Sequence, residues 1–323
     1  MIVGSGENVY EVVQNWPKLP PGWSLDEVAG VAVDSEDCVY VFNRGRHPMI
    51  VFDTDGNFLR SWGEELFSCP HSVRIGQDGM IYCVDRDGHT VRKLTPEGEL
   101  VLTLGAKDRP SETGAQGLDF RTVRHSSGPF NYPTDIAFGP SGELFVSDGY
   151  GNARVHRFAH DGELLTSWGE PGDGTGCFNL PHAIWIDKAK RLYIADRENS
   201  RIQIFTLDGD FITQWRDANR PTCISMDDKG AVYVTELGYL VGLFPGMRAP
   251  SGREPLPRLT IRSMKGKVLA RWGGEDRCSP GNFYAPHAVC IDSRGDLYVG
   301  EVTRTTGAPP GCHTIQKFVR ENI

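Results

Sequence analysis

The sequence predicts an all-β protein, a six-bladed β-propeller, and three features support this prediction. One segment type recurs six times along the 323 residues, at a spacing of about 40 residues, which is typical of four-stranded propeller blades. Each copy alternates apolar and polar residues in short runs, as half-buried strands do. Turns such as Asp-Gly, Glu-Gly and Lys-Gly separate many of these runs and favour antiparallel hairpins.

The first two strands of each predicted blade give the clearest pattern. An apolar strand leads through a tight turn to a β-branched strand that ends in an acid or an amide. These strand pairs span residues 28–45, 70–88, 133–152, 181–200, 221–238 and 286–303. The third and fourth strands are clearest in residues 90–105, 154–169 and 201–215. We therefore expect one propeller domain over residues 1–323.

The last blade lacks a fourth strand in its own segment. Residues 313–323 supply only a third strand, whereas residues 9–16, VYEVVQNW, match the pattern of fourth strands elsewhere. We expect the N-terminal segment to complete the last blade, because this pairing removes an exposed sheet edge.

An acid or amide ends the second strand of every blade. Because this position is polar in all six copies, we interpret it as structural, with the side chain holding the loop after strand two. The residues are Asn43, Asp85, Asp148, Asp196, Glu236 and Glu301.

Three histidines occupy one equivalent position near the start of the first strand. His71, His182 and His287 each follow a proline and belong to the second, fourth and sixth blades. The first strand of a blade lines the central channel, so alternate blades would direct three imidazoles at the channel axis. A lone buried histidine is more often a hydrogen-bonded core residue, but three at one repeat position favour a metal site. Three neutral nitrogens with an open position suit zinc or another divalent transition metal.

The loop after strand two lies at the same end of a blade as the start of strand one, because the two strands are antiparallel. This loop carries Arg44, Arg86, Tyr150 and Arg197 in the first four blades. We therefore expect these side chains on the same face as the histidines.

Two insertions, residues 106–131 and 238–259, also fall in connections predicted for that face. Loops of this length are more often functional than idle.

Composition restricts the partners. The net charge is −8 and no basic tract occurs, which argues against nucleic acid as a ligand. No run of 18 apolar residues predicts a membrane span. Eight cysteines without CxxC spacing, several within predicted strands, favour reduced thiols and a cytoplasmic location. The sequence does not indicate the oligomeric state.

Six motifs carry a resemblance to a known family: FNRGRH, LFSCPHSVRI, VSDGYGNARV, NLPHAIWID, IADRENSRIQIF and YAPHAVCID. With these motifs the chain resembles, over nearly its whole length, the peptidyl-α-hydroxyglycine α-amidating lyases, a branch of the NHL-repeat six-bladed propellers. The resemblance implies that His71, His182 and His287 bind a catalytic zinc. It also implies cleavage of the N–C bond of an N-acyl-α-hydroxyglycine, which releases a primary amide and glyoxylate.

The same resemblance places Arg44, Tyr150 and Arg197 at active-site positions. A carbinolamide must lose its hydroxyl proton as the amide nitrogen leaves. We expect Tyr150 to accept that proton, with its phenolate held by a neighbouring cation, for which we name Arg44. An arginine fork also suits the carboxylate of the substrate.

The chain departs from the family around the third histidine. The structural calcium of the family is held by carbonyls that match Val31 and Val73 and by an aspartate that matches Ala288. Without this carboxylate we do not expect calcium. Ala285 replaces a methionine that lines the family's pocket, and Arg86 adds a cation. We therefore expect a small anionic substrate, an N-acyl-α-hydroxyglycine or a related small carbinolamide.

Two alternatives belong to other classes. A propeller lactonase or esterase would hydrolyse an ester with a metal-activated water, although such sites usually present Glu, Asn and Asp. A non-catalytic NHL interaction module would bind a partner protein and no metal.

Overall fold

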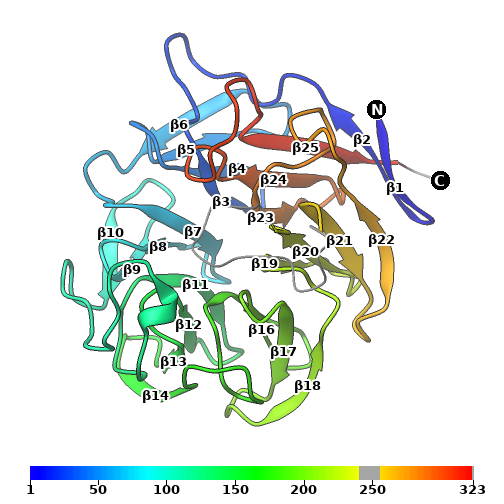
Figure 1. The fold of residues 1–323 in the computed structure, drawn as a ribbon. Coiled ribbons are helices and arrows are strands. Elements are labelled where there is room, and N and C mark those ends of the chain that lie inside the picture. The colour runs from blue at the N-terminus through cyan, green and yellow to red at the C-terminus, as the bar shows by residue number, and fades with distance from the viewer. Residues whose placement is uncertain (240–254, 322–323) are drawn as a thin grey trace. The chain divides into compact units, whose positions relative to one another are not determined.

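A computed structural model describes residues 1–239 and 255–321, and its strands form six antiparallel sheets (Figure 1). Each sheet is one blade, and the fold is a six-bladed β-propeller, as the sequence predicts. The described chain adds one short 3-10 helix at Phe120–Thr122. Most of the predicted insertion 238–259 lies outside the described residues.

The chain divides into two compact units, residues 1–62 with 222–323 and residues 63–221. We call them unit 1 and unit 2 and describe each by itself. The prediction of one domain over residues 1–323 stays a prediction.

Unit 2 contains three complete blades, each built from four consecutive strands. They are β7 Pro70–Ile75, β8 Ile81–Asp85, β9 Thr90–Leu94 and β10 Leu100–Leu104, then β11 Pro133–Phe138, β12 Leu144–Asp148, β13 Arg154–Phe158 and β14 Leu164–Trp168, then β15 Pro181–Ile186, β16 Leu192–Asp196, β17 Arg201–Phe205 and β18 Phe211–Trp215. The apolar residues of β8, β12 and β16 are buried in clusters between adjacent sheets.

Unit 1 contains the other three blades. Two are β3 Val28–Val33, β4 Val39–Asn43, β5 Met49–Phe52 and β6 Phe58–Trp62, and β19 Pro221–Met226, β20 Val232–Glu236, β21 Arg258–Arg262 and β22 Val268–Trp272. The last joins β23 Pro286–Ile291, β24 Leu297–Glu301 and β25 Ile315–Arg320 to the N-terminal strands β2 Asn8–Val13 and β1 Ile2–Ser5.

The N-terminal segment completes the last blade, as predicted. Strand β2 pairs antiparallel with β25, placing Tyr10 opposite Arg320 and Val12 opposite Phe318. The structure adds β1, which pairs with β2 as a fifth strand.

The acid that ends strand two is structural, but its main contacts are with the link that enters strand one. Asp85 accepts hydrogen bonds from the backbone N–H groups of Ser68 and Cys69 at 2.8–3.1 Å. Asp148 accepts a hydrogen bond from the backbone N–H of Asn131. Asn131 precedes Asp148 by 17 residues, as Ser68 precedes Asp85. A fully buried carboxylate thus satisfies backbone donors that would otherwise lose their solvent partners.

Replacing Asp85 with alanine is expected to lower the free energy of unfolding by about 3–5 kcal/mol, because it removes the acceptor of part-buried N–H groups and the anion that pairs with the buried Arg92 guanidinium. Urea unfolding checks this. Asp161→Ala, in an exposed turn, should change the value by less than about 0.5 kcal/mol. An Asp85→Ala loss below about 1 kcal/mol would contradict the assigned role.

Two cysteines differ from the expectation of reduced thiols. Cys278 and Cys312 form a disulfide within unit 1, whereas the other six are free. The sequence did not predict this disulfide, because the two cysteines are 34 residues apart in separate loops. The cytoplasmic location stays a prediction and loses part of its support.

The described part of the chain includes no helix with the length and hydropathy needed to cross a bilayer.

Candidate metal centre

A β-bulge presents each of the three predicted histidines. In β7, Pro70 pairs with Asp85 and Ser72 with Val84, so His71 falls between two ladder pairs. His182 in β15 and His287 in β23 occupy the same kind of bulge. A bulge changes the direction of the side chain of the extra residue. Each imidazole can therefore leave the direction that regular strand alternation would give it.

Backbone carbonyls fix the tautomer of two of these rings. Nδ1 of His71 lies 2.6 Å from the carbonyl oxygen of Thr134, and Nδ1 of His287 lies 2.7 Å from that of Ala29. Because a carbonyl only accepts, we assign the proton to Nδ1 in each neutral ring. Nε2 is then the unprotonated nitrogen, the arrangement found in metal-binding histidines.

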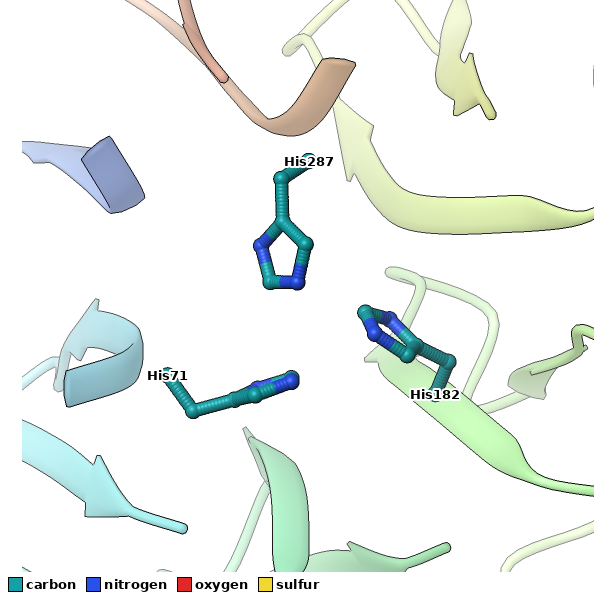
Figure 2. Close-up of side chains that lie close together, drawn as sticks. All are labelled: His71, His182 and His287. Carbon is teal, nitrogen blue, oxygen red and sulfur yellow. The ribbon is translucent and has the colours of Figure 1, made fainter. Parts of the chain in front are cut away.

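Within unit 2, His71 and His182 converge. Their ring centroids are 4.8 Å apart, and Figure 2 shows the two side chains extending towards one another. The Tyr150 hydroxyl lies 3.1 Å from Nε2 of His182 and 3.4 Å from Nε2 of His71. All three side chains are at least nine-tenths buried. One phenolic oxygen therefore lies beside both predicted ligand atoms.

Two guanidinium groups flank Tyr150. Arg197 donates from Nη1 to the Tyr150 hydroxyl at 3.1 Å, and its central carbon lies 5.2 Å from the ring centroid. The central carbon of Arg86 lies 5.4 Å from the same centroid. Burial lowers the pKa of Arg197, but Tyr150 and Glu198 outweigh burial and raise it, so the group stays charged. Arg197 is thus a cation beside the hydroxyl, and the expectation that Arg44 also holds the Tyr150 oxygen stays a prediction.

The comparisons with known proteins identify the family of this chain. The NHL repeat model matches residues 130–158 and 178–205. NHL repeat-containing protein 3 of Mus musculus is 32% identical over 90% of this chain and 78% of its own length. Peptidyl-alpha-hydroxyglycine alpha-amidating lyase 2 of Drosophila melanogaster is 27% identical over 90% of this chain and 72% of its length. The chain belongs to the NHL-repeat family that includes these lyases.

Longer relatives carry the same region. Peptidylglycine alpha-amidating monooxygenase of Rattus norvegicus is 29% identical over 94% of this chain, which spans only 32% of that protein. Among solved structures, virginiamycin B lyase from Staphylococcus aureus matches with a TM-score of 0.59 and 15% identity, over 91% of this chain and 95% of that one. This likeness shows the propeller fold.

The predicted insertion 106–131 is held to the loop after β12 by hydrogen bonds. Thr113 donates from Oγ1 to the carbonyl of Gly151 at 2.5 Å, and Asn131 donates from Nδ2 to Thr113 Oγ1. Gly151 N–H in turn donates to the carbonyl of Asn131 at 3.0 Å. The insertion thus holds the loop that carries Tyr150, a role that length alone could not predict.

The remaining predicted residues belong to unit 1. Arg44 forms an ion pair with Glu27, with Nη1 and Oε2 3.2 Å apart. Ala285 is fully buried in a cluster with Ala29, Leu237 and Val302, so a direct contact with substrate would require this cluster to open.

The buried His89 predicts a pH dependence. Its Nδ1 accepts from the N–H of Tyr132 at 3.0 Å, and burial lowers its pKa below the ordinary 6.5, against nearby carboxylates. The stability that the neutral ring contributes is therefore present above pH 6.5 and is lost as pH falls through the lowered pKa.

Between pH 7.5 and 5.0 we expect His89→Gln to show about 1 kcal/mol less loss of unfolding free energy than the unchanged protein, since glutamine does not titrate. Urea unfolding at each pH measures the difference. Parallel pH profiles for the two proteins would contradict the assignment.

Proposed function

We propose that this protein is a metal-dependent carbon–nitrogen lyase that cleaves N-acyl-α-hydroxyglycines or related small carbinolamides. One observation carries the proposal: the Tyr150 hydroxyl is held between the Nε2 atoms of His71 and His182 and the guanidinium of Arg197. A phenolic oxygen beside two metal-ligating nitrogens and a fixed cation suits proton abstraction next to a Lewis acid. The named lyases among the relatives support the reaction class.

The donor set fits zinc or another divalent transition metal. In the described residues, His71, His182 and His287 are the one group of three or more His, Cys, Asp or Glu side chains that could hold a metal ion. We propose all three as ligands through Nε2. Imidazole nitrogens suit zinc, whereas calcium takes oxygen ligands, and Ala288 packs in an apolar cluster. When bound, the ion would polarise a substrate oxygen and stabilise negative charge on it.

The side chains would then carry the proton. Tyr150 Oη takes the proton of the substrate hydroxyl, and a C=O bond forms at that carbon. The N–C bond breaks, its electron pair stays on the amide nitrogen, and the nitrogen takes up the proton from Oη. The products are a primary amide and glyoxylate, and no water is consumed.

The arginines would serve two purposes. Arg197 keeps a positive charge beside the Tyr150 oxygen, where it would stabilise the negative charge of the transition state. Arg86 and Arg44 are our candidates for the carboxylate of a small anionic substrate, because a guanidinium binds a carboxylate through two parallel hydrogen bonds. The net charge of −8 argues against nucleic acid as a partner.

Glyoxylate release tests the proposal. The protein, purified without chelators and loaded with zinc, is mixed with N-acyl-α-hydroxyglycines whose acyl groups range from acetyl to a short peptide. We expect glyoxylate from at least one of them, and loss of turnover after dialysis against a chelator. No release from any acyl group by the metal-loaded protein would overturn the assignment.

A further inference from the structure

We propose that Glu198 is a positioning residue that fixes the guanidinium of Arg197 against the Tyr150 hydroxyl, with Arg220 as its anchor. The inference deepens the proposed function and rests on it for its effect on turnover. None of the sequence patterns assigned a role to Glu198 or Arg220.

The contacts of Glu198 determine the orientation of Arg197. Glu198 Oε1 accepts from Arg197 Nε at 2.7 Å, while Arg197 Nη1 donates to the Tyr150 hydroxyl at 3.1 Å. A guanidinium is planar and rigid, so a hydrogen bond at Nε limits the directions in which Nη1 can point. Glu198 thereby determines that Nη1 of Arg197 points at the Tyr150 hydroxyl.

Arg220 fixes Glu198 from the other side. It donates from Nη2 to Oε1 at 3.0 Å and from Nε to Oε2 at 3.1 Å, a two-point contact. The backbone N–H of Arg220 donates to Ser200 Oγ, and the N–H of Glu198 donates to the carbonyl of Asn179. Both ends of the ion pair are therefore tied to the backbone of unit 2.

Arg197, Glu198 and Arg220 are almost fully buried, so salt and water screen their interactions little. The side chains of Arg197 and Arg220 are each 3% exposed and that of Glu198 is 6% exposed. Burial raises the pKa of Glu198, but the two arginines outweigh it, and the pKa lies below its ordinary value. One anion thus lies between two cations, and the net positive charge of this trio faces the Tyr150 oxygen.

The blade of β7–β10 offers a matched control within unit 2. Arg86 and Asp87 occupy the equivalent loop positions, and Arg86 Nε donates to Asp87 Oδ1 at 2.7 Å. Asp87, however, is 41% exposed, and Arg86 lies over the ring of Tyr150. An acid next to an arginine is therefore present in both loops, but only Glu198 acts on an arginine that donates to the hydroxyl.

The test is Glu198→Gln, compared with Asp87→Asn. We expect Glu198→Gln to lower kcat about 10–100-fold, as a misplaced group does, with KM and metal content per chain within about twofold of the unchanged protein. Asp87→Asn should leave kcat within about threefold, because Asp87 holds Arg86, whose proposed role in substrate binding would change KM instead. Unchanged kcat in Glu198→Gln, or an equal loss in both variants, would overturn the proposal.

The double variant Glu198→Gln with Arg220→Met is the control for misfolding, because it removes one buried cation together with the anion. This double variant should fold and show the same low kcat; recovery of kcat to the unchanged level would overturn the proposal. A second readout does not need turnover. In NMR spectra the Arg197 Nε–H should be protected from solvent exchange in the unchanged protein and should exchange faster in Glu198→Gln, because a neutral amide oxygen is a weaker acceptor than a carboxylate.

These readouts separate two failures. If the unchanged protein releases no glyoxylate, the proposed function fails, and the Arg197 signal still tests the positioning role. If it releases glyoxylate but the Arg197 signal is the same in Glu198→Gln, the positioning role fails and the proposed function stands.

Discussion

Replacing His182 with alanine is expected to remove the metal and the activity together. His182 supplies one of three proposed nitrogen ligands. Among the described residues, the group that could hold a metal consists of His71, His182 and His287 and includes no carboxylate or thiolate to replace it. Because altering even the partners of ligands costs 10–100-fold in affinity, loss of a ligand should reduce bound metal to well below one ion per chain. Elemental analysis after purification without chelators measures the metal.

His156 provides the control for this variant. It is a buried histidine of the same unit, and its ring nitrogens face Ser167 and Asp148. His156→Gln should lose stability and keep its metal. Stoichiometric metal in His182→Ala would contradict the proposed centre, and equal metal loss in both variants would assign the effect to misfolding.

Removing only the Tyr150 hydroxyl is expected to have a comparable effect on turnover without metal loss. Tyr150→Phe keeps the ring between Arg86 and Arg197 but removes the oxygen that contacts His71 and His182. A general base contributes about 10²–10⁴-fold, so kcat should fall by that factor while one metal per chain remains. Steady-state glyoxylate release and elemental analysis check the two halves of the prediction.

Tyr132→Phe is the matched control, since Tyr132 lies in the same unit and packs against His89. Its kcat should stay within about threefold of the unchanged protein. If Tyr150→Phe retained more than a tenth of the activity, the proton would have to be taken by another group.

The fold was predictable because it depends on patterns that the sequence repeats. Alternation and tight turns recur in every blade, so β2 could be assigned to the last blade from its resemblance to other fourth strands. Strand β1 was missed because IVGS has four residues, one of them glycine, and no alternation. The Cys278–Cys312 pair was missed because it depends on how two loops meet.

The candidate site was predictable at the level of backbone position but not of side-chain direction. The repeat identified His71 and His182, and strand direction placed Tyr150 and Arg197 at the same end of their blades. Which arginine reaches the hydroxyl depends on loop conformation and on a buried acid. Glu198 directly follows Arg197 in the sequence, and this acid was the available signal that Arg197 is held in one orientation.

The identity of the acyl product tests the account most directly. The metal-loaded protein is incubated with an N-acyl-α-hydroxyglycine in water enriched in ¹⁸O, and the acyl product is measured by mass spectrometry. A carbon–nitrogen lyase gives the unlabelled primary amide in amounts equal to glyoxylate, and Tyr150→Phe gives neither. A labelled carboxylic acid in place of the amide would mean that the site hydrolyses its substrate, and would contradict the account.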